Sequence, residues 1–238
     1  MAKFPTVLIL TGGLGTRMNI LYPNIPKALI PINGEPFIAH QLRLLARQGV
    51  SDIILCVGNQ SEPIVEYIGS GKTLGLNINY SYDGAKLRGT GGAVRRAAQS
   101  LRDPFAVLYG DSYLDTEFAS ILNAFYRSNK LALVTVFMNN NERIRSNILY
   151  QSGVVLDYNK EKPKTKMKHI DYGLSIFQPQ ALSVCPNLET FDLAEVFLAL
   201  IKAKELAAYE VQDRFYEIGS PDGLAELVSH LANTSKKK

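Results

Sequence analysis

The sequence predicts a three-layer α/β sandwich around a mostly parallel mixed sheet. Short apolar runs typical of strands alternate with segments of helical periodicity through the first 138 residues. Strands separated by helices of this length cannot pair as hairpins, so the alternation predicts parallel pairing with helices on both faces. From about residue 139 the strands become shorter, which predicts a mixed extension of the same sheet. Ligands of such sheets bind at the carboxyl ends of the strands.

The elements of the first half follow from apolar periodicity and its interruptions. Thr6 to Leu10 is a β-rich run closed by glycines, and Phe37 to Gln48 carries apolar residues at helical spacing up to Gly49. The same two patterns then repeat along the chain. They predict strands at 52–57, 76–82, 105–109 and 131–137, and helices at 62–68, 93–101 and 118–127.

The second half is expected to add short strands and two helices. The patterns predict strands at 148–150, 153–158 and 170–177, and helices at 193–204 and 222–231. No linker, repeat or low-complexity segment divides the chain. We therefore expect a single domain over residues 1–232 with two halves, 1–138 and 139–232, followed by a disordered basic tail at 233–238.

Composition excludes several classes of protein. The 238 residues are 46% apolar, enough for a folded core, and the longest apolar runs are far shorter than the ~20 residues of a membrane span. We expect a cytoplasmic protein with no membrane partner. The formal charge of +4 does not imply a nucleic-acid partner, and Cys56 and Cys185 match no metal or disulfide spacing. Nothing in the sequence indicates an oligomeric state.

A glycine-rich turn, Gly12-Gly13-Leu14-Gly15-Thr16-Arg17, directly follows the first expected strand. Three glycines in four residues let backbone N–H groups approach a ligand closely, which is typical of an anion site. The turn lacks the lysine of a Walker loop, and it has Met18 where a dinucleotide-binding fingerprint needs a third glycine. Glycine spacing alone therefore leaves two interpretations open, a phosphate-binding loop and an ordinary strand-to-helix turn.

Two cations after the glycines favour phosphate binding. Arg17 is suited to hold a polyphosphate through two parallel hydrogen bonds, and Lys27, on a loop stiffened by Pro26, is a compact point charge. The segment 31–36, Pro-Ile-Asn-Gly-Glu-Pro, follows them. This ordered series resembles the opening signature of the sugar-1-phosphate nucleotidyltransferases, or nucleotide-sugar pyrophosphorylases. The resemblance implies their Rossmann-like nucleotide-diphospho-sugar transferase fold.

The resemblance continues to about residue 231. The segment 88–93 resembles the family's stretch against the nucleobase, although Arg88 replaces a leucine. Tyr109-Gly110-Asp111 resembles a strand end whose aspartate binds metal, although Tyr109 replaces an asparagine, and the segment 215–221 resembles a late motif with a second metal carboxylate. At this length the chain is similar to heptose-1-phosphate guanylyltransferases and muramate-1-phosphate uridylyltransferases.

The resemblance implies a nucleotide site in the first half and a sugar-phosphate site in the second. Asp111 and Glu217 would hold Mg²⁺, for which carboxylate oxygens are suitable ligands, while Arg17 would hold the leaving pyrophosphate and Lys27 the α-phosphate. For the sugar phosphate the resemblance implies Asn147, Asp171 and Gly173. The remaining residues implied to bind the nucleotide are Thr11, Gly12, Gly13, Gly15, Thr16, Asp83, Arg88, Gly89 and Thr90.

One catalytic lysine is not assigned by the sequence. The family binds the sugar phosphate with a lysine that follows a strand as Glu-Lys-Pro. Alignment to the preceding strand favours Lys160, whereas the Glu-Lys-Pro string itself and the distance to Gly173 favour Lys162. Both remain candidates.

The resemblance implies an Mg²⁺-dependent enzyme that transfers a nucleotidyl group from an NTP to a sugar 1-phosphate for surface glycan synthesis. GTP is the first choice of nucleotide, with UTP and CTP as alternatives. Two other hypotheses stay open. One is a cytidylyltransferase that acts on a non-sugar phosphate acceptor, and the other is a nucleotide-binding regulatory subunit that has lost catalysis.

Overall fold

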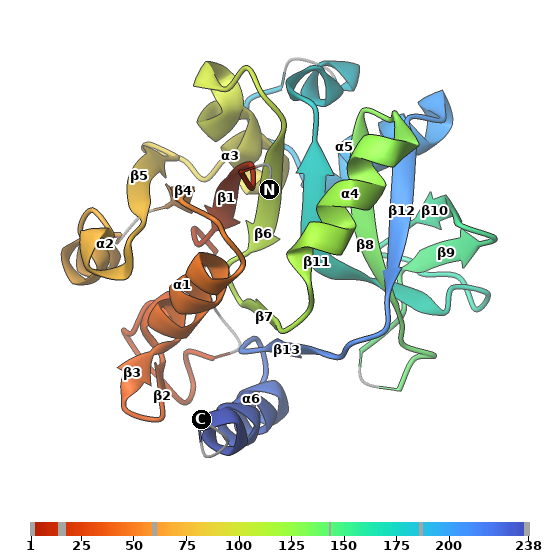
Figure 1. The fold of residues 1–238 in the computed structure, drawn as a ribbon. Coiled ribbons are helices and arrows are strands. Elements are labelled where there is room, and N and C mark those ends of the chain that lie inside the picture. Colours follow the sequence, from red (N-terminus) through yellow and green to blue (C-terminus); the bar gives the residue numbers. More distant parts are fainter. Residues whose placement is uncertain (1–2, 14–17, 59–60, 143, 186–187, 236–238) are drawn as a thin grey trace.

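A nine-stranded sheet lies at the centre of the computed structural model within the part of the chain that it describes (Figure 1). Seven strands lie side by side in the order β10-β9-β11-β6-β1-β4-β5, and β8 joins β11 to β12. Only β10 and β11 run against the other strands of this described sheet. The description covers residues 3–13, 18–58, 61–142, 144–185 and 188–235.

The strands alternate with helices along most of the chain. The strands are β1 (Thr6–Leu10), β2 (Pro31–Ile32), β3 (Glu35–Pro36), β4 (Asp52–Val57), β5 (Asn77–Tyr82), β6 (Phe105–Tyr109), β7 (Ser112–Leu114), β8 (Ala132–Met138), β9 (Ile148–Gln151), β10 (Val154–Tyr158), β11 (His169–Phe177), β12 (Leu206–Val211) and β13 (Phe215–Glu217). The α-helices are α1 (Phe37–Arg47), α2 (Glu62–Ile68), α3 (Gly89–Ala97), α4 (Phe118–Ser128), α5 (Leu193–Ala203) and α6 (Pro221–Ser235), and short 3₁₀ turns lie at 27–29, 72–74, 98–100 and 179–184.

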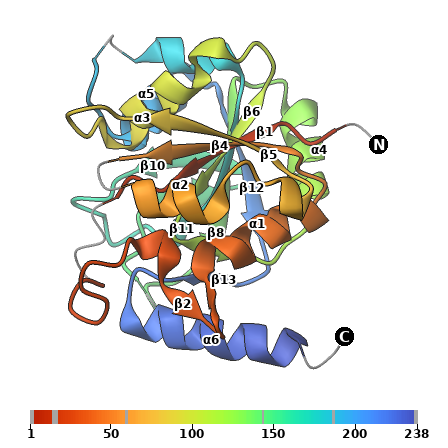
Figure 2. The same cartoon turned by 90° about the vertical axis from the view of Figure 1, so that its left-hand side faces the viewer.

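Helices cover both faces of the sheet. The apolar sides of α1, α2 and α4 share one buried cluster with the sheet, and those of α3 and α5 share another. Figure 2 shows the sheet close to edge-on, with α3 and α5 above it and α1 below. The predicted three-layer architecture and the mixed, mostly parallel sheet are confirmed.

The C-terminal part forms a third, smaller cluster beneath the sheet. Strand β13 pairs antiparallel with β7, and α6 packs next to it through Leu224, Leu227 and Leu231 against Phe37 and Tyr113. The segment between β12 and α6, which contains β13, therefore returns to the carboxyl end of β6, because β7 follows β6 directly (Figure 1). No described helix is long and apolar enough to cross a membrane.

Several elements differ from those expected. Helix α3 begins at Gly89 instead of at residue 93, and β7, β12 and β13 were not predicted. Helix α6 extends to Ser235, so residues 233–235, expected in the tail, continue the helix. Residues 236–238 lie outside the described part of the chain.

Candidate active site

A cavity of about 290 Å³ lies where the predicted nucleotide-binding residues converge. It opens at the carboxyl ends of β1, β4, β5 and β6, where the chain passes from one side of β1 to the other. Ligands bind at this switch point in open α/β sheets. The lining residues are Leu10, Thr11, Gly12, Gly13, Lys27, Ala28, Cys56, Asp83, Leu87, Gly89, Thr90, Ala93, Tyr109, Gly110 and Asp111.

At the floor of the cavity, the carboxyl ends of β1, β4 and β6 approach one another closely. The Thr11 hydroxyl donates to the Cys56 carbonyl at 2.9 Å, and a Cβ at Gly12 would lie 3.1 Å from the Gly58 nitrogen. A Cβ at Gly110 would collide with the Leu10 carbonyl oxygen. Glycine is therefore required at Gly110 by packing. The other predicted members of the turn, Gly15, Thr16 and Arg17, lie outside the described residues.

The glycine segment at the start of α3, residues 89–92, contacts two different parts of the molecule. Gly89 and Thr90 line the cavity, and Gly89 has the positive φ of +67° that favours glycine. The backbone N–H groups of Gly91 and Gly92 donate instead to the Phe191 carbonyl, in the segment before α5. A Cβ at Gly91 would collide with the Phe191 ring. Of the predicted segment, Gly89, Thr90 and Ala93 therefore lie at the cavity, whereas Gly91 and Gly92 contact the segment around Phe191.

Asp83, just after β5, lines one end of the cavity and contacts Arg88, which is not among the lining residues described. Asp83 is 6% exposed, its carboxylate accepts from the Arg88 backbone N–H at 3.3 Å, and its carbonyl accepts from the Arg88 guanidinium at 2.8 Å. Burial raises the pKa of Asp83, and the Arg88 backbone N–H and charge oppose this effect. A carboxylate at this position offers hydrogen-bond acceptors to the edge of a base.

Lys27 and Asp111 form the opposite, charged end. The Lys27 ammonium donates to an Asp111 carboxylate oxygen at 2.7 Å. Gln41, fully buried on α1, donates from its side-chain amide to the Tyr109 and Ser112 carbonyls at 3.1 and 2.7 Å. These two bonds bracket Gly110-Asp111 and fix the turn that carries the carboxylate.

Glu217 reaches the same region through strand pairing. It lies opposite Ser112 in the β13–β7 pair, and the Ile218 N–H donates to the Asp111 carbonyl at 3.0 Å. Both Glu217 carboxylate oxygens accept hydrogen bonds from their own turn, one from the Gly219 N–H and one from the Ser220 hydroxyl. No group of three or more His, Cys, Asp or Glu side chains suited to a metal ion occurs among the described residues.

The two candidate lysines lie in different surroundings. The Lys160 ammonium is 3.4 Å from the Tyr109 hydroxyl, 3.6 Å from an Asp192 carboxylate oxygen, and 5.3 Å from the centre of the Tyr109 ring. Lys162 is exposed, and its backbone N–H donates to the Asn159 side chain at 2.8 Å. The structure brings Lys160 next to a cavity-lining residue.

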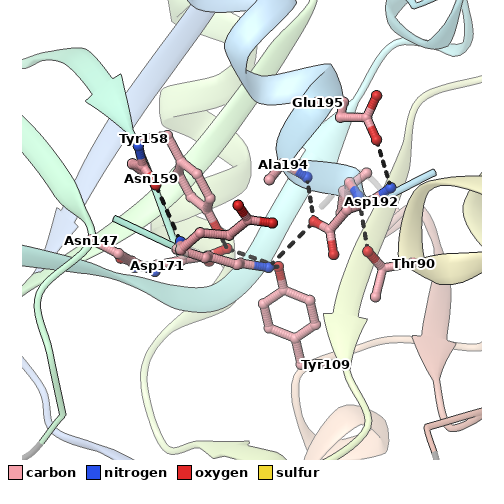
Figure 3. A network of polar contacts seen from close by, with 12 residues as sticks. Thr90, Tyr109, Asn147, Tyr158, Asn159, Asp171, Asp192, Ala194 and Glu195 are labelled. Carbon is pink, nitrogen blue, oxygen red and sulfur yellow. Dashed lines mark hydrogen bonds and ion pairs between the residues drawn. The ribbon is translucent and has the colours of Figure 1, made fainter. Parts of the chain in front are cut away.

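Two of the predicted sugar-side residues, Asn147 and Asp171, lie close together in Figure 3. The Asp171 carboxylate accepts from the Tyr109 and Tyr158 hydroxyls, each at 2.9 Å, and from the Gly173 N–H at 3.0 Å. The Asn147 side chain accepts from the Asp171 N–H at 3.3 Å. Asn147, Asp171 and Gly173 are therefore held in one network.

Sequence reasoning missed three contributors to this arrangement. Gln41 is a buried polar residue inside an amphipathic helix, and its position on the apolar side was the available signal. Tyr158 ends an expected strand without any motif. Asp192 begins α5, where its side chain and Glu195 form a capping box. The pattern Asp-x-x-Glu before an apolar run indicates this cap from the sequence alone. No sequence pattern indicates that the Asp192 side chain lies near Lys160.

The fold is an α/β sandwich with a cavity at the carboxyl ends of its strands, and comparison with known proteins identifies the class of protein. A family model described as nucleotidyl transferase matches residues 6–234. The chain therefore belongs to the nucleotidyl transferase family, and it is a nucleotidyltransferase. The sequence-based assignment to sugar-1-phosphate nucleotidyltransferases is confirmed.

The chain matches nearly the whole length of one relative and about two thirds of the length of another. The chain is 30% identical over 216 residues to the D-glycero-alpha-D-manno-heptose 1-phosphate guanylyltransferase of Campylobacter jejuni, covering 90% of this chain and 95% of that protein. It is 29% identical to the mannose-1-phosphate guanyltransferase of Saccharomyces cerevisiae, covering 97% of this chain but only 66% of the yeast protein. The structure of HddC from Yersinia pseudotuberculosis superimposes with a TM-score of 0.81 at 23% identity, covering 96% of this chain and 100% of that one, and this likeness shows a shared fold.

Proposed function

We propose that the protein transfers a guanylyl group from GTP to a sugar 1-phosphate and releases pyrophosphate. The observation that carries this proposal is the cavity, with the Lys27–Asp111 pair at one end, the Asp83 carboxylate at the other, and Lys160 on the far side of Tyr109. The guanylyltransferase names of the Campylobacter and yeast relatives support GTP as the donor. We further propose, from the sequence resemblance, that the product feeds surface glycan synthesis.

The reaction needs positioning and charge neutralisation more than covalent catalysis. An oxygen of the sugar 1-phosphate attacks the α-phosphorus in line, the new P–O bond forms, and the bond to the β-phosphate oxygen breaks as pyrophosphate leaves with that electron pair. Lys27 would neutralise charge at the α-phosphate, and Lys160 would hold the acceptor phosphate. Arg17, which lies outside the described residues, is proposed for the leaving pyrophosphate on the strength of the sequence motif alone.

The residues at the charged end suit a magnesium ion. Mg²⁺ is usually held by one or two carboxylates and completed by phosphates and water. The side chain of Asp111 is 36% exposed at the cavity and offers one carboxylate oxygen free of Lys27, although the Ser112 hydroxyl lies 3.4 Å from it. Glu217 is adjacent, although its oxygens accept from Gly219 and Ser220. Asp111 would hold the ion and Glu217 would assist; a bound Mg²⁺ supplies charge neutralisation at the phosphates.

Pyrophosphate release from the full chain tests the proposal. Each of the four NTPs is incubated with Mg²⁺ and one of three acceptors, heptose 1-phosphate, mannose 1-phosphate or a non-sugar phosphate such as phosphocholine, with and without EDTA. We expect release with GTP above the other nucleotides, and loss of release with EDTA. We also expect Lys27→Met to lower kcat roughly a hundredfold or more, because it removes a charge at the reacting phosphates.

The matched control is Lys72→Met, since Lys72 is an exposed lysine just before β5, away from the carboxyl ends of the strands. It should retain wild-type kcat. Absence of release with every nucleotide and sugar phosphate, in folded protein, would overturn the proposal. Release only with CTP and a non-sugar phosphate would replace it with a cytidylyltransferase.

A further inference from the structure

The Asp171 carboxylate accepts three hydrogen bonds from the protein. One oxygen accepts from both the Tyr109 and the Tyr158 hydroxyl, and the other accepts from the Gly173 N–H. Burial raises the pKa of both tyrosines, so their hydroxyls keep the protons that they donate. In this arrangement Asp171 orients two tyrosine hydroxyls.

The orientation of the Tyr109 hydroxyl determines which further hydrogen bond its oxygen can accept. Its single proton points to Asp171, which leaves a lone pair on the oxygen for a second donor. The Lys160 ammonium is that donor, at 3.4 Å. Figure 3 shows Tyr109 between Asp171 on one side and Asp192 on the other.

Tyr109 is also the residue that connects this network with the nucleotide cavity. It is the last residue of β6, it lines the cavity, and it lies two positions before Asp111. The Lys160 ammonium lies over the Tyr109 ring at 5.3 Å and over the Tyr158 ring at 5.6 Å, distances at which aromatic faces attract a cation. One rigid side chain therefore borders both the nucleotide space and the ammonium.

We propose that the Tyr109 hydroxyl is a positioning group that holds the Lys160 ammonium toward the acceptor phosphate at the cavity edge. This inference rests on the proposed function of the site. Asp192 is a weaker candidate for the task, because its side chain is 50% exposed and the same oxygen accepts the Ala194 N–H as the cap of α5. Lys162 has no described side-chain contact with the network.

Two conservative variants distinguish the positioning of Lys160 from a general contribution to the hydrogen bonds of Asp171. Tyr109→Phe and Tyr158→Phe each remove one 2.9 Å hydrogen bond to the same Asp171 oxygen, and each keeps its ring. Only Tyr109→Phe also removes the oxygen that accepts from Lys160. We expect Tyr109→Phe to raise the KM for the sugar 1-phosphate roughly five- to tenfold, with the KM for GTP unchanged, and Tyr158→Phe to raise it less than half as much.

A double-mutant cycle tests whether the effect passes through Lys160. In a Lys160→Met background, Tyr109→Phe should add no further change to the acceptor KM. An equal effect of Tyr109→Phe with and without Lys160, or equal effects of the two tyrosine variants, would overturn the proposal.

Crystal structures of the two variants give a readout that needs no activity. Lys160 Nζ should leave its place beside residue 109 in Tyr109→Phe and stay in Tyr158→Phe; an unmoved Lys160 in both would overturn the inference. If wild-type protein releases no pyrophosphate with any substrate pair, the proposed function fails, and these structures still decide whether Tyr109 places the lysine.

Discussion

Asp83 is an acidic side chain that the fold buries just after β5, where it lines the cavity. Burial raises its pKa, and its carboxylate accepts a hydrogen bond from the Arg88 backbone N–H. Guanine presents two adjacent donors, N1–H and the 2-amino group, which a single carboxylate can accept. Uracil presents only one donor at its corresponding edge. Because an unpaired buried acceptor is costly, Asp83 is suited to discriminate between these bases.

The substitution Asp83→Asn tests this discrimination. The amide keeps one acceptor and replaces the other with a donor that faces the donors of guanine. We expect the ratio of kcat/KM for GTP over UTP to fall roughly tenfold or more. The measurement is steady-state pyrophosphate release with both nucleotides. Asp103→Asn, at an exposed bend, serves as the control, and an unchanged ratio in Asp83→Asn would remove Asp83 from base selection.

At the scale of elements, α1 holds the turn between β6 and β7 that carries Asp111. Gln41 donates to the carbonyls of Tyr109 and Ser112, on either side of Gly110-Asp111. Two turns later, at the C-cap of α1, Gln48 makes a comparable pair of bonds with the Thr116 carbonyl and the Phe118 N–H, at the start of α4. The helix thus has one anchor at the site and a second one away from it.

The two glutamines provide a matched comparison. Gln41→Leu leaves two carbonyls without their donor, so we expect a loss of about 1–3 kcal/mol in the free energy of unfolding and at least a tenfold fall in kcat. Gln48→Leu should lower stability by a similar amount with kcat unchanged. Urea unfolding and pyrophosphate release measure the two effects. Equal kcat values for the two variants would show that Gln41 does not position Asp111.

The elements that sequence patterns missed owe their form to tertiary contacts. The glycines at the start of α3 have poor helix propensity, yet the helix begins at Gly89 because the Phe191 carbonyl accepts the Gly91 and Gly92 N–H groups. Strand β12 follows α5 without a turn motif, and most of its residues are half-buried, so its sequence carries little alternation. It becomes a strand because β8 offers a parallel partner.

At the scale of the whole molecule, the amino ends of the strands carry a separate ionic cluster. Asp52, at the start of β4, pairs with Lys3 at 2.5 Å and accepts from the Asn77 amide at 3.0 Å. These bonds lower the pKa of Asp52 to about 2, from an ordinary value of 3.8. The cluster lies at the edge of the sheet opposite the cavity.

This lowered pKa makes stability depend on pH in acid. The unfolded chain binds the proton at higher pH than the folded one, so the stabilisation is present above pH 3.8 and is lost as the pH falls toward 2. We expect Asp52→Asn to cost about 1 kcal/mol at pH 7, after screening by solvent, with wild-type activity. Urea unfolding at pH 7 and pH 3 should show the difference from wild type shrinking in acid. A difference that is the same at both pH values would contradict the assignment.

The sequence by itself determined the layered α/β fold and the nucleotidyltransferase family of the protein. Apolar periods of two and 3.6 residues follow from backbone geometry, so they predicted the helices, and the strands of the central sheet other than β12, within a few residues. The family motifs at residues 12–17, 26–36, 88–93 and 109–111 are local strings, so the nucleotidyltransferase assignment was available before any coordinates.

The tertiary structure alone decided how distant residues meet. Lys160 and Lys162 are two residues apart in sequence, but only Lys160 lies beside Tyr109, 51 positions away. Glu217 arrives next to Asp111 by strand pairing, with its carboxylate bonded to its own turn, and Gln41 reaches the same turn from a helix 68 to 71 residues earlier. Such contacts depend on how separate elements pack against each other, and no local pattern in the chain encodes that geometry.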